Sequence, residues 1–356
     1  MKTKLIYVLT CSESGTYIEQ ALMSIWSARH HNPDAHIVLL TDDKTDRLLT
    51  GTRGGLLDYV TEKIVVPFVD ENASMMFRSR WIKTSARELV EGDFLFIDCD
   101  TIVCKSLAEI DGFQCEMGAV WESHLLVEDF CDSLKSSATK ANLKIGVDLE
   151  EEKEYFSSGV IYVKDSPLTH RLYVLWHEFW LESFSLGLPI DQPALAKANR
   201  ECGHVIKKIP DTYNCILFTQ NNFTDEAHVL HIAAYKNPSF LFTDLVLGLL
   251  KREGLIDWLK GFILRPCDSM LPFDYSIRHS SIKQRLSWIR SFALMASTLA
   301  NKFPVLLDEF FMKSLPKGVA WLINKHGYTM AAVCWMGWKR LYVLKKKGLK
   351  DNICRK

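Results

Sequence analysis

Apolar and polar residues near the start of the chain follow the order strand, helix, strand. Lys4–Cys11 is an apolar run that fits a first buried strand better than a signal peptide. In Tyr17–His30 the apolar residues recur at the spacing of one helical face, and His36–Leu40 is again apolar. Short links between these segments predict a βαβ unit and therefore a parallel sheet.

Similar runs continue to about residue 240. Further strands are predicted at Thr61–Pro67, Phe94–Ile97, Gly118–Glu122, Tyr155–Val163, Val205–Ile209 and Ala227–Ile232. Helices are predicted at Arg80–Val90, Leu168–Phe184 and Ala194–Asn199, and a polar surface excursion at Glu128–Glu154. The pattern predicts an α/β fold over residues 1–240, with a Rossmann-like central sheet that is mixed, mostly parallel and flanked by helices. Residues 241–356 are predicted to form a helical C-terminal extension.

The strongest chemical signal follows the predicted strand Phe94–Ile97, where Asp98 and Asp100 stand on either side of Cys99. Two carboxylates at the end of a buried strand are costly unless a positive charge neutralises them. A turn is the simpler interpretation of a lone Asp-x-Asp, but the apolar residues on both sides favour a metal site. Hard oxygen ligands suit Mn²⁺ or Mg²⁺, which often bridge to substrate phosphates. The motif therefore points to chemistry on a diphosphate.

A histidine and a lysine near the end of the strand pattern form a second group. His231 ends a short apolar run, and Lys236 follows it five residues later. One interpretation of His231 is a hydrogen-bonded core histidine. The other is a third metal ligand, since a neutral imidazole is a good ligand for Mn²⁺. The compact ammonium of Lys236 would then suit a phosphate.

Two further groups have structural and functional interpretations that the residues leave open. Asp191 and Gln192 stand at a helix start, where Asp191 could cap the helix or both side chains could bind a sugar. Arg78, Arg80 and Lys83 precede the Asp-x-Asp strand. They could be solvated surface residues, or they could lie at phosphates and position the metal carboxylates.

The composition of the chain indicates in which cellular compartment the protein works and which classes of partner it lacks. The chain has 356 residues, 48% hydrophobic residues and no net formal charge, which gives no sign of nucleic-acid binding. Its 10 cysteines include no Cys-x-x-Cys pair, so free thiols in a reducing compartment are expected, and no zinc site. No stretch of the sequence reaches the ~18 charge-free apolar residues of a spanning helix.

Charge is unevenly distributed along the chain. Residues 301–356 carry 12 Lys and Arg against three acidic residues, whereas residues 1–300 carry 31 basic and 40 acidic residues. Aromatic residues are interleaved with this basic stretch. A helical subdomain packed on the catalytic domain would explain the pattern, but the basic cluster favours an interfacial helix on an anionic membrane surface. We therefore expect a cytoplasmic protein that lies peripherally on the inner face of the membrane.

Taken in order, these blocks resemble the GT-A nucleotide-sugar glycosyltransferases, most closely glycosyltransferase family 8 and its bacterial relatives. The matching blocks are Arg80, Ile97-Asp98-Cys99-Asp100, Ser157-Ser158-Gly159-Val160, Asp191-Gln192, and His231 with Lys236. The resemblance spans about residues 4–240. Ser157 stands where the family usually has Asn, Lys236-Asn237-Pro238 lacks the family's Trp, and Arg80 lies one residue further from Asp98.

The resemblance implies transfer of a sugar from a nucleoside diphosphate sugar, first of all a UDP-sugar, to an acceptor hydroxyl with retention of configuration. It implies Asp98, Asp100 and His231 as ligands of Mn²⁺ or Mg²⁺, and Asp191 and Gln192 as catalytic residues that face the sugar. Donor binding is assigned to Thr10, Cys11, Ser12, Arg80, Lys83, Ser158, Gly159 and Lys236. The acceptor is expected to be a glycan or lipid-linked, as in lipopolysaccharide and surface glycan synthesis.

Other reactions and functions would use similar residues. An inverting transferase would need a general base, for which Asp191 or Glu122 could serve. A Mg²⁺-dependent nucleotidyltransferase also needs paired carboxylates, but the chain has no Gly-x-x-x-x-Gly-Lys-[Ser/Thr] motif and no glycine-rich activating loop near its start. A degenerate GT-A domain could act as a binding or scaffold protein, although the intact Asp98, Asp100 and His231 argue against it.

Overall fold

The computed structural model describes residues 1–68, 70, 72–130, 132–216, 226–232, 240–242 and 244–266. The predicted phosphate contact Lys236 and the basic stretch 301–356 lie outside these residues. The described part of the predicted helical extension consists mainly of α9 (Asp244–Glu253) and α10 (Asp257–Ile263).

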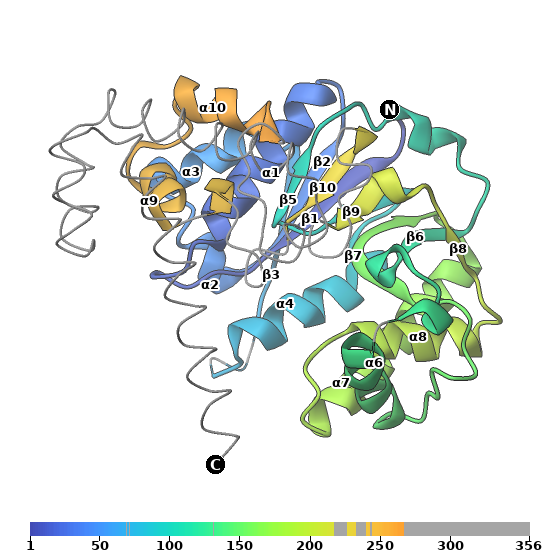
Figure 1. The fold of residues 1–356 in the computed structure, drawn as a ribbon. Coiled ribbons are helices and arrows are strands. Elements are labelled where there is room, and N and C mark those ends of the chain that lie inside the picture. The colour runs from blue at the N-terminus through green and yellow to red at the C-terminus, as the bar shows by residue number, and fades with distance from the viewer. Residues whose placement is uncertain are drawn as a thin grey trace, which may run out of the picture. The chain divides into compact units, whose positions relative to one another are not determined.

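A seven-stranded sheet forms the centre of the fold, with the strand order β3-β2-β1-β4-β7-β6-β8 (Figure 1). The neighbours from β3 to β4 pair in parallel, as do β6 and β8, whereas β7 is antiparallel to both β4 and β6. This confirms the predicted mixed, mostly parallel sheet. The strands are β1 (Lys4–Leu9), β2 (Ile37–Asp42), β3 (Glu62–Val66), β4 (Phe94–Ile97), β6 (Met117–Trp121), β7 (Phe156–Val163) and β8 (Ile206–Lys208).

The central strands could be read from the sequence because they are covered on both faces. Every residue of β2 and of β4 is buried. Parallel strands with both faces covered form continuous apolar runs instead of alternating patterns. The predicted strands agree with the observed ones to within two residues at either end.

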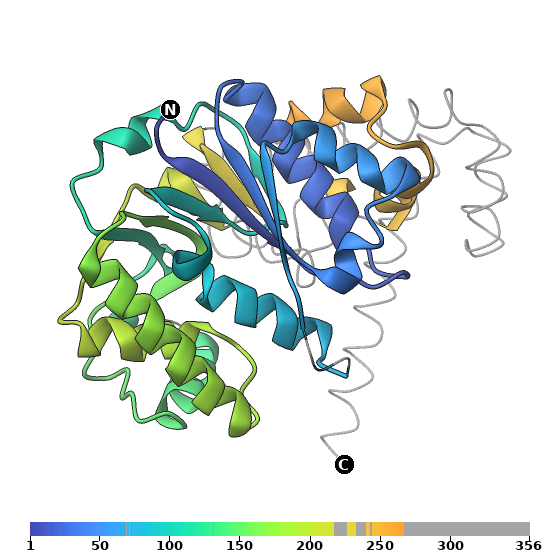
Figure 2. The ribbon, with the colours of Figure 1, turned by 180° about the vertical axis from the view of Figure 1, so that it is seen from behind.

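Helices gather on the two sides of the sheet. In Figures 1 and 2, α1, α3 and α9 lie on the side of β1–β3, whereas α6, α7 and α8 lie beside β6–β8. None of the described helices is long and apolar enough to cross a membrane. Besides α9 and α10 the helices are α1 (Tyr17–His31), α2 (Asp43–Asp46), α3 (Gly51–Gly54), α4 (Met75–Thr84), α5 (Ala86–Leu89), α6 (Asp132–Leu143), α7 (Pro167–Ser185) and α8 (Gln192–Glu201).

The single helix predicted at Arg80–Val90 is wrong. Helix α4 begins earlier, because the side chain of Ser74 accepts the backbone N–H of Phe77 and so caps the first turn. Ser85 has non-helical backbone angles and separates α4 from α5. Arg80 therefore lies in the middle of a helix instead of at its start.

The polar surface excursion predicted at Glu128–Glu154 is also wrong. This stretch holds helix α6, and it buries Ile145, Val147 and Leu149 in the main hydrophobic core. The three apolar residues alternate with exposed or half-buried ones in the turns that follow α6.

A second, three-stranded sheet has the order β5-β10-β9. It consists of β5 (Thr101–Val103), β10 (Val229–His231) and β9 (Cys215–Ile216). Strand β10 is antiparallel to β5 and parallel to β9. Only residues 98–100 separate β4 from β5, so the chain passes from the central sheet to the small sheet at the Asp-x-Asp motif.

Candidate metal centre and donor site

The Asp-x-Asp motif lies where the two sheets meet. Asp98 directly follows β4, and its backbone N–H donates to the carbonyl of Gly159 in β7 at 2.8 Å. Asp100 directly precedes β5, whose antiparallel register with β10 sets Thr101 opposite His231. Backbone pairing alone therefore brings a histidine from a distant part of the sequence next to the second aspartate.

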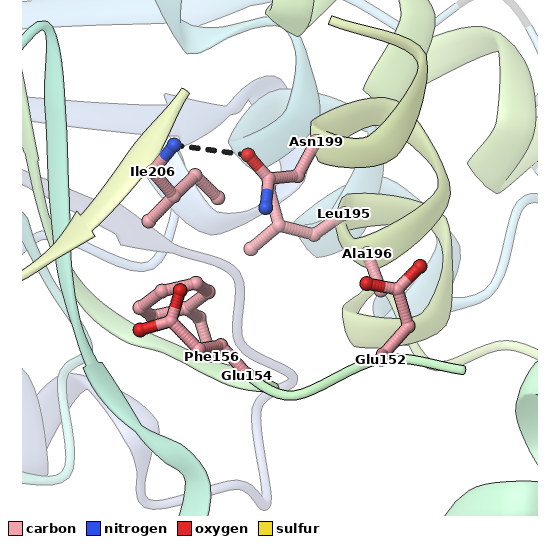
Figure 3. Close-up of a pocket in the computed structure, with 7 residues that line it drawn as sticks. All are labelled: Glu152, Glu154, Phe156, Leu195, Ala196, Asn199 and Ile206. Atoms are coloured by element: carbon pink, nitrogen blue, oxygen red, sulfur yellow. Dashed lines mark hydrogen bonds between the residues drawn. The ribbon is translucent and has the colours of Figure 1, made fainter. Parts of the chain in front are cut away.

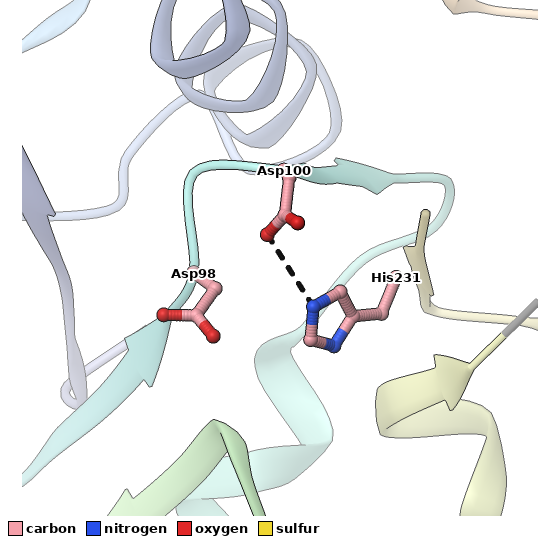
Figure 4. A group of neighbouring side chains, drawn as sticks. All are labelled: Asp98, Asp100 and His231. Carbon is pink, nitrogen blue, oxygen red and sulfur yellow. Dashed lines mark ion pairs between the residues drawn. The ribbon is translucent and has the colours of Figure 1, made fainter. Parts of the chain in front are cut away.

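The three predicted metal ligands come together at this junction (Figure 4). One ligand atom from each of Asp98, Asp100 and His231 lies within 4.8 Å of the other two. The Nε2 atom of His231 is 3.3 Å from Oδ1 of Asp100, and these two side chains are 12% and 18% exposed. The group is thus partly shielded from water but accessible. Its role as a metal site remains a prediction.

The electrostatics of the three side chains favour a bound cation. Burial raises the pKa of Asp98; Lys83 opposes this shift, and the neighbouring Asp100 adds to it. For His231, burial lowers the pKa, but the carboxylates of Asp100, Asp98 and Glu122 together outweigh burial, and the net pKa is raised. A divalent cation would relieve the repulsion between the two carboxylates. Two carboxylates and an imidazole fit Mn²⁺ well and can also accept Mg²⁺.

Lys83 is the buried cation of the site, with its side chain only 2% exposed. Its ammonium lies 3.6 Å from Oδ1 of Asp98, 3.1 Å from Oδ2 of Asp191 and 3.2 Å from the hydroxyl of Ser158. An ammonium has three N–H donors, and three acceptors of the protein surround this one. The geometry favours a role in holding the carboxylates in place, and a direct contact with the donor remains a prediction.

Asp191 is held between two cations. Its Oδ1 is 3.1 Å from Nε of Arg80, while Lys83 contacts its other oxygen. The side chain of Asp191 does not cap helix α8, so the capping interpretation is wrong. Burial alone would raise the pKa of Asp191, but Lys83 and Arg80 hold it at about 2. A carboxylate with so low a pKa is a weak base near neutral pH.

Gln192 has a fixed orientation. Its amide nitrogen donates to Oε2 of Glu122 and to the carbonyl of Phe156, both at 2.8 Å. These two bonds use both amide hydrogens and so set the direction of the side-chain carbonyl. Glu122 leads into a tight turn in which Ser123 and His124 both have positive φ, 58° and 61°. Such backbone angles are uncommon outside glycine and cluster at functional sites.

The predicted nucleotide contacts lie at the carboxyl end of β1, as the βαβ reading implies. Thr10 and Cys11 are buried, whereas Ser12 is exposed. The N–H of Cys11 donates to the hydroxyl of Thr45 at 2.8 Å, and the hydroxyl of Thr10 donates to the carbonyl of Met75 at 3.2 Å. Neighbouring segments therefore fix this backbone. Contact of these residues with a nucleotide stays a prediction.

The structure adds Asn214, which was not among the sequence-based candidates. Its Oδ1 lies 3.0 Å from Nδ1 of His231, and its amide nitrogen donates to the hydroxyl of Ser157 at 3.2 Å. Asn214 ends a 3₁₀ turn, Asp211–Asn214, in a stretch where no strand or helix was predicted. Its partners lie 17 and 57 residues away along the chain, so no local pattern could indicate it.

A small hollow beside α8 includes none of the predicted site residues (Figure 3). Within it, Oδ1 of Asn199 accepts the N–H of Ile206 at 2.9 Å, and Phe156 connects it to the site through the carbonyl that holds Gln192. The residues that line it are Glu152, Glu154, Phe156, Leu195, Ala196, Asn199 and Ile206.

The sequence matches no protein-family model and no curated protein. Its structural neighbours are glycosyltransferases. The bifunctional glycosyltransferase WbbM in its apo form is 13% identical, with 74% of this chain and 51% of that chain covered and a TM-score of 0.49. The galactosyltransferase LgtC, in complex with donor and acceptor sugar analogues, is 16% identical, with 64% and 86% covered and a TM-score of 0.43. Mouse xyloside xylosyltransferase 1 is 12% identical, with 65% and 97% covered and a TM-score of 0.43.

These likenesses are distant, because every one of these identities is below 25% and every TM-score is below 0.5. The activity proposed for this chain therefore rests on the geometry of its own residues.

Proposed function

We propose that this chain is a metal-assisted glycosyltransferase of the GT-A type. It would move a sugar from a nucleoside diphosphate sugar, most simply a UDP-sugar, to an acceptor hydroxyl. The observation that supports the proposal is the meeting of Asp98, Asp100 and His231 at the junction of two sheets. The acid–cation group of Asp191, Arg80 and Lys83 adjoins them through the contact of Lys83 with Asp98.

In this proposal Asp98, Asp100 and His231 hold Mn²⁺ or Mg²⁺. When bound, the ion would supply Lewis-acid stabilisation of the negative charge that develops on the departing diphosphate. Lys83 keeps Asp98 in position from the protein side. We also assign the charge of Lys236, which lies outside the described residues, to the diphosphate.

The sugar would face Gln192, whose amide hydrogens are occupied by Glu122 and by the carbonyl of Phe156. Its carbonyl is then the group that remains to meet the sugar. Asp191, with its pKa of about 2, is poorly suited to take the proton of an acceptor hydroxyl, as an inverting transferase would require. This supports retention of configuration over inversion through Asp191.

The nucleotide would lie at the end of β1, near Thr10, Cys11 and Ser12, because ligands of such sheets bind beyond the carboxyl ends of the strands. For the acceptor we propose a glycan or a lipid-linked glycan of a surface polysaccharide or lipopolysaccharide. The basic, aromatic stretch 301–356 would bring the enzyme to the membrane face where such acceptors are held.

The test is a panel of nucleotide sugars with Mn²⁺, with release of nucleoside diphosphate as the readout. Release from one of these donors, lost in Asp100→Asn, would support the proposal. Pyrophosphate release from a nucleoside triphosphate would instead identify a nucleotidyltransferase. Binding of nucleotide sugars without turnover by any acceptor or by water would indicate a binding protein.

A further inference from the structure

We infer that Asn214 is a positioning residue for the metal centre: it orients the imidazole of His231 so that Nε2 faces the two aspartates. This inference rests on the proposed function, because it assigns a role to a residue behind the proposed metal ligand. Within the described part of the chain, the side chain of Asn214 hydrogen-bonds to His231 and Ser157 and to neither aspartate, so its effect on an ion would pass through the imidazole.

The contacts of Asn214 fix it at both ends of its side chain. The residue is completely buried, with Oδ1 at 3.0 Å from Nδ1 of His231 and Nδ2 at 3.2 Å from the hydroxyl of Ser157. That hydroxyl also accepts the N–H of Gly159 at 3.4 Å, and the carbonyl of Gly159 accepts the N–H of Asp98. A continuous set of hydrogen bonds therefore joins the histidine to the backbone of the first aspartate.

The contact between Asn214 and His231 determines which nitrogen of the imidazole carries a hydrogen. An amide oxygen only accepts hydrogen bonds, so Nδ1 must carry the hydrogen in this pair. A neutral imidazole has one N–H, so Nε2, which can donate to Asp100 while no ion is bound, would offer its lone pair to a cation. Nε2 is the ring nitrogen that lies 3.3 Å from Oδ1 of Asp100. Metal-binding histidines commonly donate their other N–H to a carbonyl or carboxylate, which fixes both the tautomer and the ring orientation.

The first experiment measures Mn²⁺ affinity of the full chain by calorimetry. Asn214→Ala should lose roughly 10–100-fold in affinity, the usual effect of removing such an outer partner. Asn214→Asp keeps an oxygen acceptor for Nδ1 and should stay near the wild-type affinity. The matched control is Asn142→Ala, because Asn142 is equally buried and donates to Ala138 and Tyr155 instead of to a proposed ligand.

The second experiment reads the tautomer without any metal. Nitrogen-15 spectra of the metal-free protein at alkaline pH, with the ring signal assigned by its loss in His231→Gln, should give a protonated Nδ1 in the wild type. Asn214→Ala should lose this preference, whereas Asn142→Ala should keep it. A merely structural role for Asn214 would lower stability without changing the ring tautomer.

The outcomes separate this inference from the proposed function. If the wild type binds no Mn²⁺, both fail together. If the wild type binds Mn²⁺ and Asn214→Ala binds it equally well, or if Asn142→Ala loses as much affinity, the positioning role fails and the metal site stands. A wild-type ring with an unprotonated Nδ1 would overturn the inference by itself.

Discussion

Gly159 leaves the space in which His231 lies. A β-carbon at position 159 would come within 2.3 Å of Cε1 and 2.6 Å of Nδ1 of the imidazole, far closer than atoms pack. Gly159→Ala should therefore displace His231 and weaken Mn²⁺ binding by about tenfold or more. Calorimetric titration of Mn²⁺ into the metal-free variant measures this loss.

The control for this substitution is Gly248→Ala. An added β-carbon at Gly248, in helix α9, meets nothing within 4 Å. In a helix interior this change stabilises by roughly 0.5–1 kcal/mol and should leave Mn²⁺ affinity unchanged. Wild-type affinity in Gly159→Ala would mean that His231 is not a ligand.

Removal of Lys83 should destabilise the fold strongly. Lys83→Met leaves Asp98 without its lysine and Asp191 with Arg80 alone, and removal of one partner from a buried ion pair costs roughly 3–5 kcal/mol. Urea unfolding at neutral pH measures the change. Lys63→Met is the matched control, because Lys63 pairs with Asp46 at a partly exposed position, where such a pair is worth about 1 kcal/mol or less. Equal losses in both variants would contradict the structural role of Lys83.

The pairing of Asp191 should appear in the acid dependence of stability. Its pKa is lowered from 3.8 to about 2 in the folded protein, so its stabilisation is complete above the unfolded pKa and is lost as the pH falls through the folded one. This shift corresponds to about 2 kcal/mol. In urea unfolding at a series of acidic pH values, the difference in the free energy of unfolding between the wild type and Asp191→Asn should shrink as the pH falls. Parallel stability curves for the two proteins would contradict the assignment, and Asp257→Asn, at a fully exposed carboxylate, is the control.

Glu122 should support turnover by holding Gln192. Glu122→Ala removes an acceptor of the Gln192 amide and should lower kcat by about 10²-fold through misplacement of that side chain. KM and Mn²⁺ affinity should change little. Glu154→Ala is the control, since Glu154 bonds Trp121 instead. Glu122→Gln keeps an oxygen acceptor and should recover most of the rate; a loss as large as in Glu122→Ala would point to a base at position 122.

The basic C-terminal stretch should bind anionic lipid. Each lysine near an anionic surface is worth about 1 kcal/mol, so charge reversal of Lys345–Lys347 should strongly reduce co-sedimentation with anionic vesicles. Reversal of Lys105, Lys144 and Lys207, three exposed lysines of the described domain, makes the same change in net charge and should have little effect. Equal binding to neutral and anionic vesicles would contradict membrane recruitment.

The central sheet and the Asp-x-Asp group could be predicted because their signals are local. A buried strand followed directly by Asp98 and Asp100 has few other interpretations than a metal site. The apolar run before His231 indicated the end of a strand. The helix start before Arg80 was missed because the cap at Ser74 follows a stretch without apolar periodicity. In the 128–154 region the charges masked the alternation of apolar residues that the core requires.

The side chains that hold the site residues in place could not be predicted, because their roles depend on contacts between distant segments. Asn214 reaches His231 only after β9 and β10 have paired, and it reaches Ser157 only when the small sheet has packed beside β7. The same holds for Lys83, whose three acceptors come from the link after β4, from β7 and from the start of α8. Tertiary packing determines which of these polar side chains become partners, and a local sequence pattern does not predict such contacts.

Calorimetric titration of UDP into the wild-type chain, with and without Mn²⁺, tests the central claim most directly. The account predicts that Mn²⁺ markedly tightens UDP binding, and that Asp100→Asn loses this tightening, while Asp46→Asn, at the surface pair with Lys63, keeps it. UDP affinity that is the same with and without Mn²⁺, or tightening that persists in Asp100→Asn, would contradict the claim that Asp98, Asp100 and His231 hold an ion against a diphosphate.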